Sequence, residues 1–145
     1  MPFPSFVPSF AADLVAVGVT AAEQRATPMA VALVDARSAL VAFARTPDAT
    51  PAAIDAAPAK ARTAMWFGRP TADTLEIAAR RPEVYQSLIG ASPQPLVLSM
   101  GGIPLHHDGE IVGAVAAAGA KLGATDIEVA EVMVEAWTQA TADAR

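Results

Sequence analysis

The chain has 145 residues, of which 53% are hydrophobic and 17% charged, and it carries a net charge of −5 with no cysteine. This length fits one ordinary domain with a single core, and the missing cysteines exclude disulfides, iron–sulfur clusters, thiolate-ligated zinc or haem and a cysteine nucleophile. The negative charge and the lack of a Lys/Arg cluster argue against nucleic acid as a partner, and the apolar composition favours a homo-oligomer, a dimer or larger.

The N-terminal region predicts no signal peptide. The first basic residue is Arg25, and no apolar run reaches the length that spans a membrane. We therefore expect a cytoplasmic protein with no membrane partner, unless a leader was removed. Three prolines within residues 1–8 favour an extended N-terminal arm, and residues 9–145 are expected to form the single domain.

The first predicted elements are a helix and a hairpin. Apolar residues spaced by four, three and four positions give a helix from about Phe10 to Arg25 one buried stripe, with Ser9 as its cap. Residues 29–45, MAVALVDARSALVAFAR, are two short apolar runs around a polar pair. Short runs rich in Val and Phe are typical of strands, so we expect a β-hairpin that is buried on both faces.

An alanine-rich helix is predicted next, ending near Phe67 because Gly68 can terminate it. Thr50 and Asp55 are both possible caps. Pro58 lies inside this segment, where a proline costs about 3 kcal/mol. The helix therefore either begins at Pro58 or is kinked there.

Two short helices and a set of strands follow. Thr71 can cap a helix through about Arg80, and Pro82 can begin another helical turn. The sequence then predicts three strands, at residues 95–100, 103–107 and 110–119. Asp108 and Gly109 join the last two strands in the pair of residues that most favours a tight hairpin turn.

The last predicted element is a helix that begins with a capping box at Thr125–Glu128 and continues to the end of the chain. Its apolar stripe consists of Val129, Val132, Met133, Ala136, Trp137 and Ala140. The order of helix, two strands, helices, three strands and helix predicts an α+β domain with a mainly antiparallel five-stranded sheet.

Four segments carry a resemblance to a known family: AVALVDARSALVAFAR, KARTAMWFGRPT, GGIPLHHDGEIVGAVAAAGA and TDIEVAEV. In this order and spacing, from about Met29 to Ala136, the chain resembles the small GlcG/HbpS-type proteins and the C-terminal domain of PduO-type corrinoid adenosyltransferases. The resemblance implies a profilin-like fold, with helices on both faces of an antiparallel sheet, and assembly into dimers or larger rings. It also implies haem binding, haem degradation or redox sensing in some members.

Both histidines of the chain lie in the predicted hairpin at residues 103–119. The Asp108–Gly109 turn pairs His107 with Glu110 and His106 with Ile111. Adjacent strand residues face opposite sides of a sheet, so the two histidines cannot bind one metal together. We expect His107 to be exposed beside Glu110, and His106 to share an apolar face with Ile111 and Val115. His106 is therefore the candidate iron ligand and acid or base; the alternative is a structural histidine at the core edge or an interface.

Three basic residues are candidates for holding an acidic group of a ligand. Lys60 and Arg62 lie in the family-like KARTA segment, and Arg45 ends the second predicted strand. A cation there can bind a propionate or a substrate carboxylate, and arginine can do so with two hydrogen bonds. The alternative is an exposed side chain or a surface ion pair.

Small residues crowd the last predicted strand, in VGAVAAAGA at residues 112–120. Small side chains allow a helix, a neighbouring subunit or a flat ligand to approach the backbone closely. The sequence leaves these three alternatives open.

The first functional hypothesis is a small-molecule-binding protein of the GlcG/HbpS type that binds haem or another flat conjugated ligand. Apart from haem, no cofactor is expected. His106 would bind the iron, and Lys60 with Arg62 or Arg45 would meet the acidic groups. The alternative is a cofactor-independent isomerase, cyclase or lyase, in which Lys60 or His106 moves a proton on an apolar carbonyl-bearing metabolite. A purely structural or regulatory oligomer is a third possibility.

Overall fold

The computed structural model of the protein describes residues 6–143. The helices and strands follow one another along the chain as α1 (Pro8–Gln24), β1 (Ala30–Asp35), β2 (Leu40–Arg45), α2 (Pro51–Phe67), α3 (Thr71–Ala78), α4 (Pro82–Ala91), β3 (Gly102–His107), β4 (Glu110–Ala118) and α5 (Gly123–Asp143). None of the helices described is long and apolar enough to cross a lipid bilayer. Residues 1–5 of the predicted N-terminal arm lie outside the described range, and Pro8 already begins α1.

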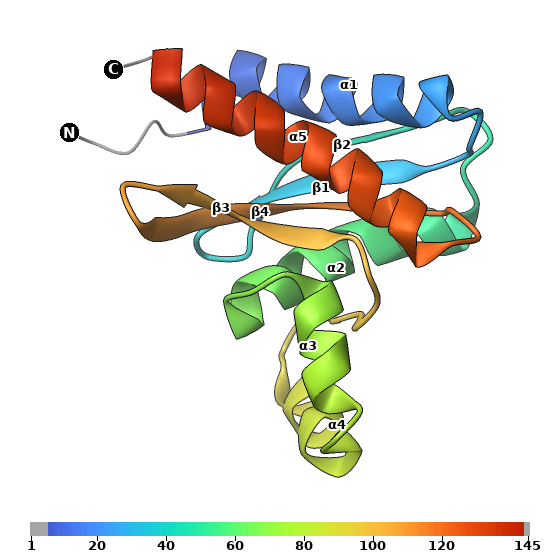
Figure 1. Ribbon diagram of the computed structural model, residues 1–145, viewed down its shortest axis with the longest axis vertical. Helices are drawn as coiled ribbons and strands as arrows, with labels where there is room; N and C mark the ends of the chain where they lie inside the picture. Colours follow the sequence, from blue (N-terminus) through green and yellow to red (C-terminus); the bar gives the residue numbers. More distant parts are fainter. Residues whose placement is uncertain (1–5, 144–145) are drawn as a thin grey trace.

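The sheet of the described residues has four antiparallel strands in the order β2-β1-β4-β3, so β1 and β4 are central. Helices α1 and α5 cover one face and α2 covers the other, whereas α3 and α4 extend away from the sheet on the α2 side (Figure 1). The prediction of an α+β fold with an antiparallel sheet between helices is therefore confirmed. The likeness to profilin stays a prediction.

The predicted five-stranded sheet is wrong, because residues 95–100 do not form a strand. This segment lies against α2, where the N–H of Val97 donates a hydrogen bond to Thr63 Oγ1 at 3.0 Å. Pro95 has no N–H to give to a sheet. The apolar run PLVLSM therefore packs its side chains without joining a ladder of backbone hydrogen bonds.

The predicted helix ends are partly confirmed. Thr50 caps α2, since its side chain accepts a hydrogen bond from Ala53 N at 3.2 Å, and Gly68 ends the helix with a positive φ of 69°. Pro58 lies within α2 rather than at its start. Ser9 does not cap α1, which begins one residue earlier at Pro8 and has no side-chain cap.

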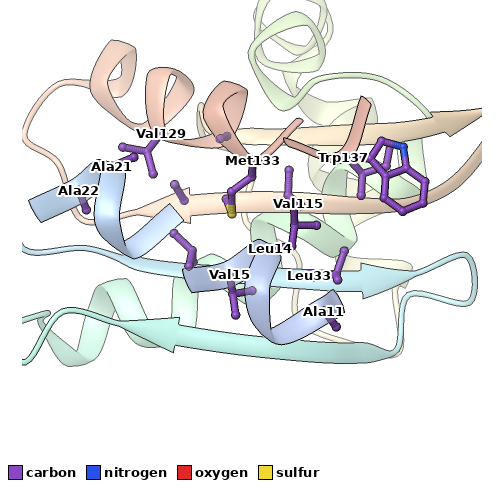
Figure 2. Packing of buried hydrophobic residues seen from close by; sticks show 14 of the residues in the cluster. Ala11, Leu14, Val15, Ala21, Ala22, Leu33, Val115, Val129, Met133 and Trp137 are labelled. Carbon is purple, nitrogen blue, oxygen red and sulfur yellow. The ribbon is translucent and has the colours of Figure 1, made fainter. Parts of the chain in front are cut away.

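The main hydrophobic core lies between the sheet and the α1–α5 layer (Figure 2). Leu14, Leu33, Val115, Met133 and Trp137 all have at most 2% of their surface exposed. The indole N–H of Trp137 donates a hydrogen bond to the carbonyl oxygen of His106 at 2.9 Å. This bond ties α5 to the end of β3, so the backbone that carries the histidines is anchored to the core.

Helix α2 packs closely against the opposite face of the sheet, because the side chains at this contact are mostly alanines on both sides. Buried alanines of α2 pack over small residues of β1 and β4, and the residues involved are Ala30, Ala32, Ala53, Ala57, Ala61, Ala64, Ala114, Ala116 and Ala118. A Cβ added at Gly102 would lie only 2.6 Å from the carbonyl oxygen of Lys60. Of the three alternatives for the small residues of β4, the structure shows a closely packed helix.

Enlarging an alanine at this contact tests the close packing. Ala61→Leu is expected to lower the free energy of unfolding by about 1–3 kcal/mol, because the fully buried side chain cannot expand without moving α2. The control Ala52→Leu, at an exposed position of the same helix, should change it by less than about 0.5 kcal/mol. Urea unfolding followed by circular dichroism measures both, and equal effects would contradict the packing.

Candidate functional site

Lys60 forms a buried ion pair that joins three elements. Only 4% of its surface is exposed. Its Nζ donates hydrogen bonds to Asp126 Oδ2 at 2.9 Å and to the carbonyl oxygen of Ala117 at 3.1 Å. The second carboxylate oxygen of Asp126, Oδ1, accepts a hydrogen bond from Ala120 N at 3.0 Å. The ion pair therefore links α2, the end of β4 and the first turn of α5.

The predicted capping box at Thr125–Glu128 is wrong, because α5 already begins at Gly123. The Asp126 carboxylate instead binds Lys60 and the N–H of Ala120. Two charges that are both shielded from water stabilise each other only while both are present. Lys60 reaches a ligand only if this pair opens. The roles predicted for Lys60 in proton transfer and in binding an acidic group therefore stay predictions.

The predicted pairing of the histidines is confirmed: His106 pairs with Ile111, and His107 with Glu110. A β-bulge between Leu105 and His106 nevertheless shifts the register. Ile111 consequently faces the end of α2: its Cδ1 would lie 3.7 Å from a Cβ added at Gly68. Val115 instead faces the main hydrophobic core between the sheet and the α1–α5 layer. His106 shares a face with its cross-strand partner Ile111, but the expectation that Val115 shares this face is wrong, because the bulge reverses the alternation between Ile111 and Val115.

The exposure of the two histidines is also the reverse of the expectation. His106 is exposed. The side chain of His107 is only 20% exposed, and its Nε2 lies 3.4 Å from Asp108 Oδ2. Both histidines line an open hollow of about 340 Å³ beside the end of α5, together with Asp108, Thr138, Thr141 and Ala142. His106 is thus an exposed residue on a strand whose backbone is held by Trp137.

Lys60 and His106 lie near opposite ends of the sheet. Lys60 Nζ contacts Ala117 on β4, six positions beyond Ile111, the partner of His106. Because the bulge leaves one of these positions unpaired, at about 3.3 Å per strand residue the separation is roughly 16 Å along the sheet. A single apolar pocket that contains both Lys60 and His106 therefore does not form.

Arg45 lies at the Lys60 end of the sheet, since it pairs with Ala30, which in turn pairs with Ala118. It is exposed, and its Nη1 donates to the carbonyl oxygens of Thr46 and Pro47 at 3.2 and 3.0 Å. The structure therefore does not bring Arg45 together with His106, and the role predicted for Arg45 in binding an acidic group stays a prediction.

Arg62 lies on α2 and lines a separate hollow of about 340 Å³ with Trp66 and with Arg37 of the β1–β2 turn. It is half-buried. The sequence singled out Arg62 but missed Arg37, because the contact between the turn and α2 depends on the tertiary fold.

Comparison with known proteins identifies the class of this α+β protein. The family model described as haem degrading protein HbpS-like matches residues 6–135, so the chain belongs to the HbpS-like family. The resemblance deduced from the sequence is confirmed. No curated protein matches the chain significantly.

Solved structures show the same fold. A double mutant of Streptomyces reticuli HbpS is 24% identical, with 94% of this chain and 89% of that chain covered and a TM-score of 0.82. A complex described as PduOC:Heme is 26% identical, with coverages of 85% and 88% and a TM-score of 0.74. The Klebsiella pneumoniae protein ORFY is 17% identical, with coverages of 92% and 90% and a TM-score of 0.79.

Removing the cation of the buried ion pair tests its structural role. Lys60→Met is expected to lower the free energy of unfolding by about 3–5 kcal/mol, because the Asp126 carboxylate is left buried without a cation. Adding Asp126→Asn to this variant should restore part of the loss, since the amide oxygen can still accept from Ala120 N.

The control is the exposed pair between Arg25 Nε and Glu128 Oε2, whose side chains are 31% and 57% exposed at a distance of 3.1 Å. Arg25→Met should cost less than about 1 kcal/mol, because water screens this pair. Similar losses for Lys60→Met and Arg25→Met in urea unfolding would show that the buried pair does not hold the layers together.

Proposed function

We propose that this protein binds haem or another flat conjugated small molecule, with His106 as the ligand to the iron. The observation that carries the proposal is that His106 is exposed and is one of the residues lining an open hollow of about 340 Å³. Membership of the HbpS-like family and the likeness to a PduOC structure described as a heme complex support the choice of ligand.

The donor chemistry around His106 fits haem better than a bare metal ion. Among residues 6–143, no group of three or more His, Asp or Glu side chains is placed to hold an ion. His106 alone would suffice to hold haem, because the porphyrin itself supplies the other donors to the iron. When bound, haem would supply an iron centre whose reactivity depends on its axial ligand.

The size of the hollow indicates how such a ligand would lie. Small-molecule pockets span about 300–1,000 Å³, so a hollow of about 340 Å³ accommodates one part of a macrocycle and leaves the rest outside. His106 would hold the iron of such a ligand, and the other residues of the hollow would contact part of the macrocycle. Lys60 would meet the acidic groups only if its ion pair with Asp126 opened.

Hemin titration tests the proposal. The wild-type protein should give a saturable shift of the Soret band, and His106→Ala should weaken binding by about tenfold or more, about 1.4 kcal/mol or more, because an iron–imidazole bond is lost. His107→Ala, the matched control, should retain the His106-dependent spectrum.

Iron-free protoporphyrin IX separates coordination from adsorption to apolar surface. His106→Ala should not change its binding, since no bond to iron is involved. If hemin gives no saturable shift, or if His106→Ala and wild-type protein bind hemin equally, the proposed function is wrong.

Self-association into a homo-oligomer belongs to the same proposal. Helix α4 includes the apolar residues Val84, Leu88 and Ile89, yet none of its residues, all of which are described, is buried. Such a helix gains stability when a second copy covers it. Light scattering coupled to size-exclusion chromatography should give at least twice the mass of one chain, and a strictly monomeric mass would contradict this part of the proposal.

A further inference from the structure

Arg62 is a partly buried cation that no other described residue neutralises. Among residues 6–143 its guanidinium makes no hydrogen bond or ion pair, and its Nε is shielded from water without an acceptor. A buried donor that lacks an acceptor costs about 1–3 kcal/mol, and more when the group is charged. An anionic oxygen from outside the chain would remove this cost.

The hollow beside Arg62 is positively charged although the whole chain carries a net charge of −5. Arg37 and Arg62 line it, and no carboxylate is among the described residues that do so. The neighbouring Asp35 is already used within the β1–β2 turn, since its Oδ1 accepts from the backbone N–H groups of Arg37 and Ala39 at 2.8 and 3.1 Å. The local charge therefore favours an anion.

The Arg37 side chain can reorient toward the hollow without disrupting the β1–β2 turn. Its side chain is 87% exposed, and its Nη2 lies 3.4 Å from Asp35 Oδ2, a weak, water-screened pair. The backbone of the turn is held by the other oxygen of Asp35. The Arg37 guanidinium can therefore turn toward an anion in the hollow while the turn keeps its shape.

Trp66 gives the same hollow a flat apolar wall. Its side chain lines the hollow and is 42% exposed, which is unusual for so large an aromatic group in a chain whose other tryptophan is 1% exposed. Phe67 meets the Trp66 ring edge-on, with centroids 5.6 Å apart and an interplanar angle of 89°, and so restricts it from one side. A planar ligand can stack on such an exposed indole.

We propose that this hollow binds a small organic acid with a flat apolar body, whose carboxylate pairs with Arg62 and whose ring packs against Trp66. A guanidinium binds a carboxylate through two parallel hydrogen bonds, so Arg62 sets the orientation of the acid. The volume of about 340 Å³ fits one or two rings. This site shares no lining residue with the His106 hollow, and it does not depend on haem binding.

Benzoate and its neutral counterpart benzamide test the proposal on the intact chain by NMR titration. Benzoate should shift the signals of the Trp66 indole N–H and the Arg62 Nε–H and leave the Trp137 indole N–H unchanged. Benzamide should bind about tenfold more weakly or not at all, because it brings no charge to the guanidinium. The two tryptophan signals are assigned with Trp66→Phe.

Variants identify the residues responsible. Arg62→Gln and Trp66→Ala should each weaken benzoate binding by about tenfold, and circular dichroism checks that both variants fold. Arg80→Gln removes an equal charge from an exposed position outside the hollow and should leave binding unchanged. His106→Ala should also leave it unchanged, so failure of the hemin experiment does not affect this test.

Three outcomes would overturn the proposal. They are the absence of benzoate binding up to about 50 mM, equal binding of benzoate and benzamide, and unchanged binding by folded Arg62→Gln.

Discussion

The buried ion pair between Lys60 and Asp126 is the constraint on which the arrangement of the layers depends. Helix α2 and helix α5 lie on opposite faces of the sheet (Figure 1), and the pair joins them around the end of β4, where Lys60 Nζ also binds the carbonyl oxygen of Ala117. Burying both charges is tolerable only because each is matched and hydrogen-bonded. The lysine of the most family-like segment is thus part of the architecture.

The two ends of the sheet differ in their polar groups: one end carries the ion pair, and the other carries the two hairpin turns. At the Lys60 end, the polar groups of α2, β4 and α5 satisfy one another. At the other end lie the turn between β1 and β2 and the turn between β3 and β4, because Asp35 pairs with Gly113 in the register of the sheet. The hollow of His106 and the hollow of Arg62 are each lined by one of these turns. The two hollows for which we propose ligands therefore lie at the end of the sheet opposite the ion pair.

Local sequence patterns predicted those parts of the structure that local interactions decide. The Asp108–Gly109 turn correctly paired His106 with Ile111, and Gly68 correctly ended α2. The bulge after Leu105 was not predictable, because period-two alternation contains no signal for one extra residue. The apolar run at residues 95–100 had the composition of a strand, but Thr63, 34 positions away, takes the N–H of Val97.

The candidate site was less predictable than the fold for the same reason. Asp126 lies within the segment predicted as a capping box, Thr125–Glu128, so nothing in the sequence pointed to a partner 66 positions away. His106 and Arg62, which the sequence named as candidate ligand-binding groups, line two separate hollows, and their roles stay predictions. The sequence also placed Lys60 and His106 in one pocket. Only the three-dimensional register separates them.

Paramagnetic mapping of bound hemin on the amide NMR spectrum tests most directly whether ligand chemistry belongs to the end of the sheet that carries His106. With zinc protoporphyrin as the diamagnetic reference, ferric hemin should broaden the signals of residues 105–112 and 138–142, and those of residues 117–126 should stay sharp. Broadening centred on Lys60 and residues 117–126 would contradict the account, because the ligand would then lie at the Lys60 end of the sheet, away from His106.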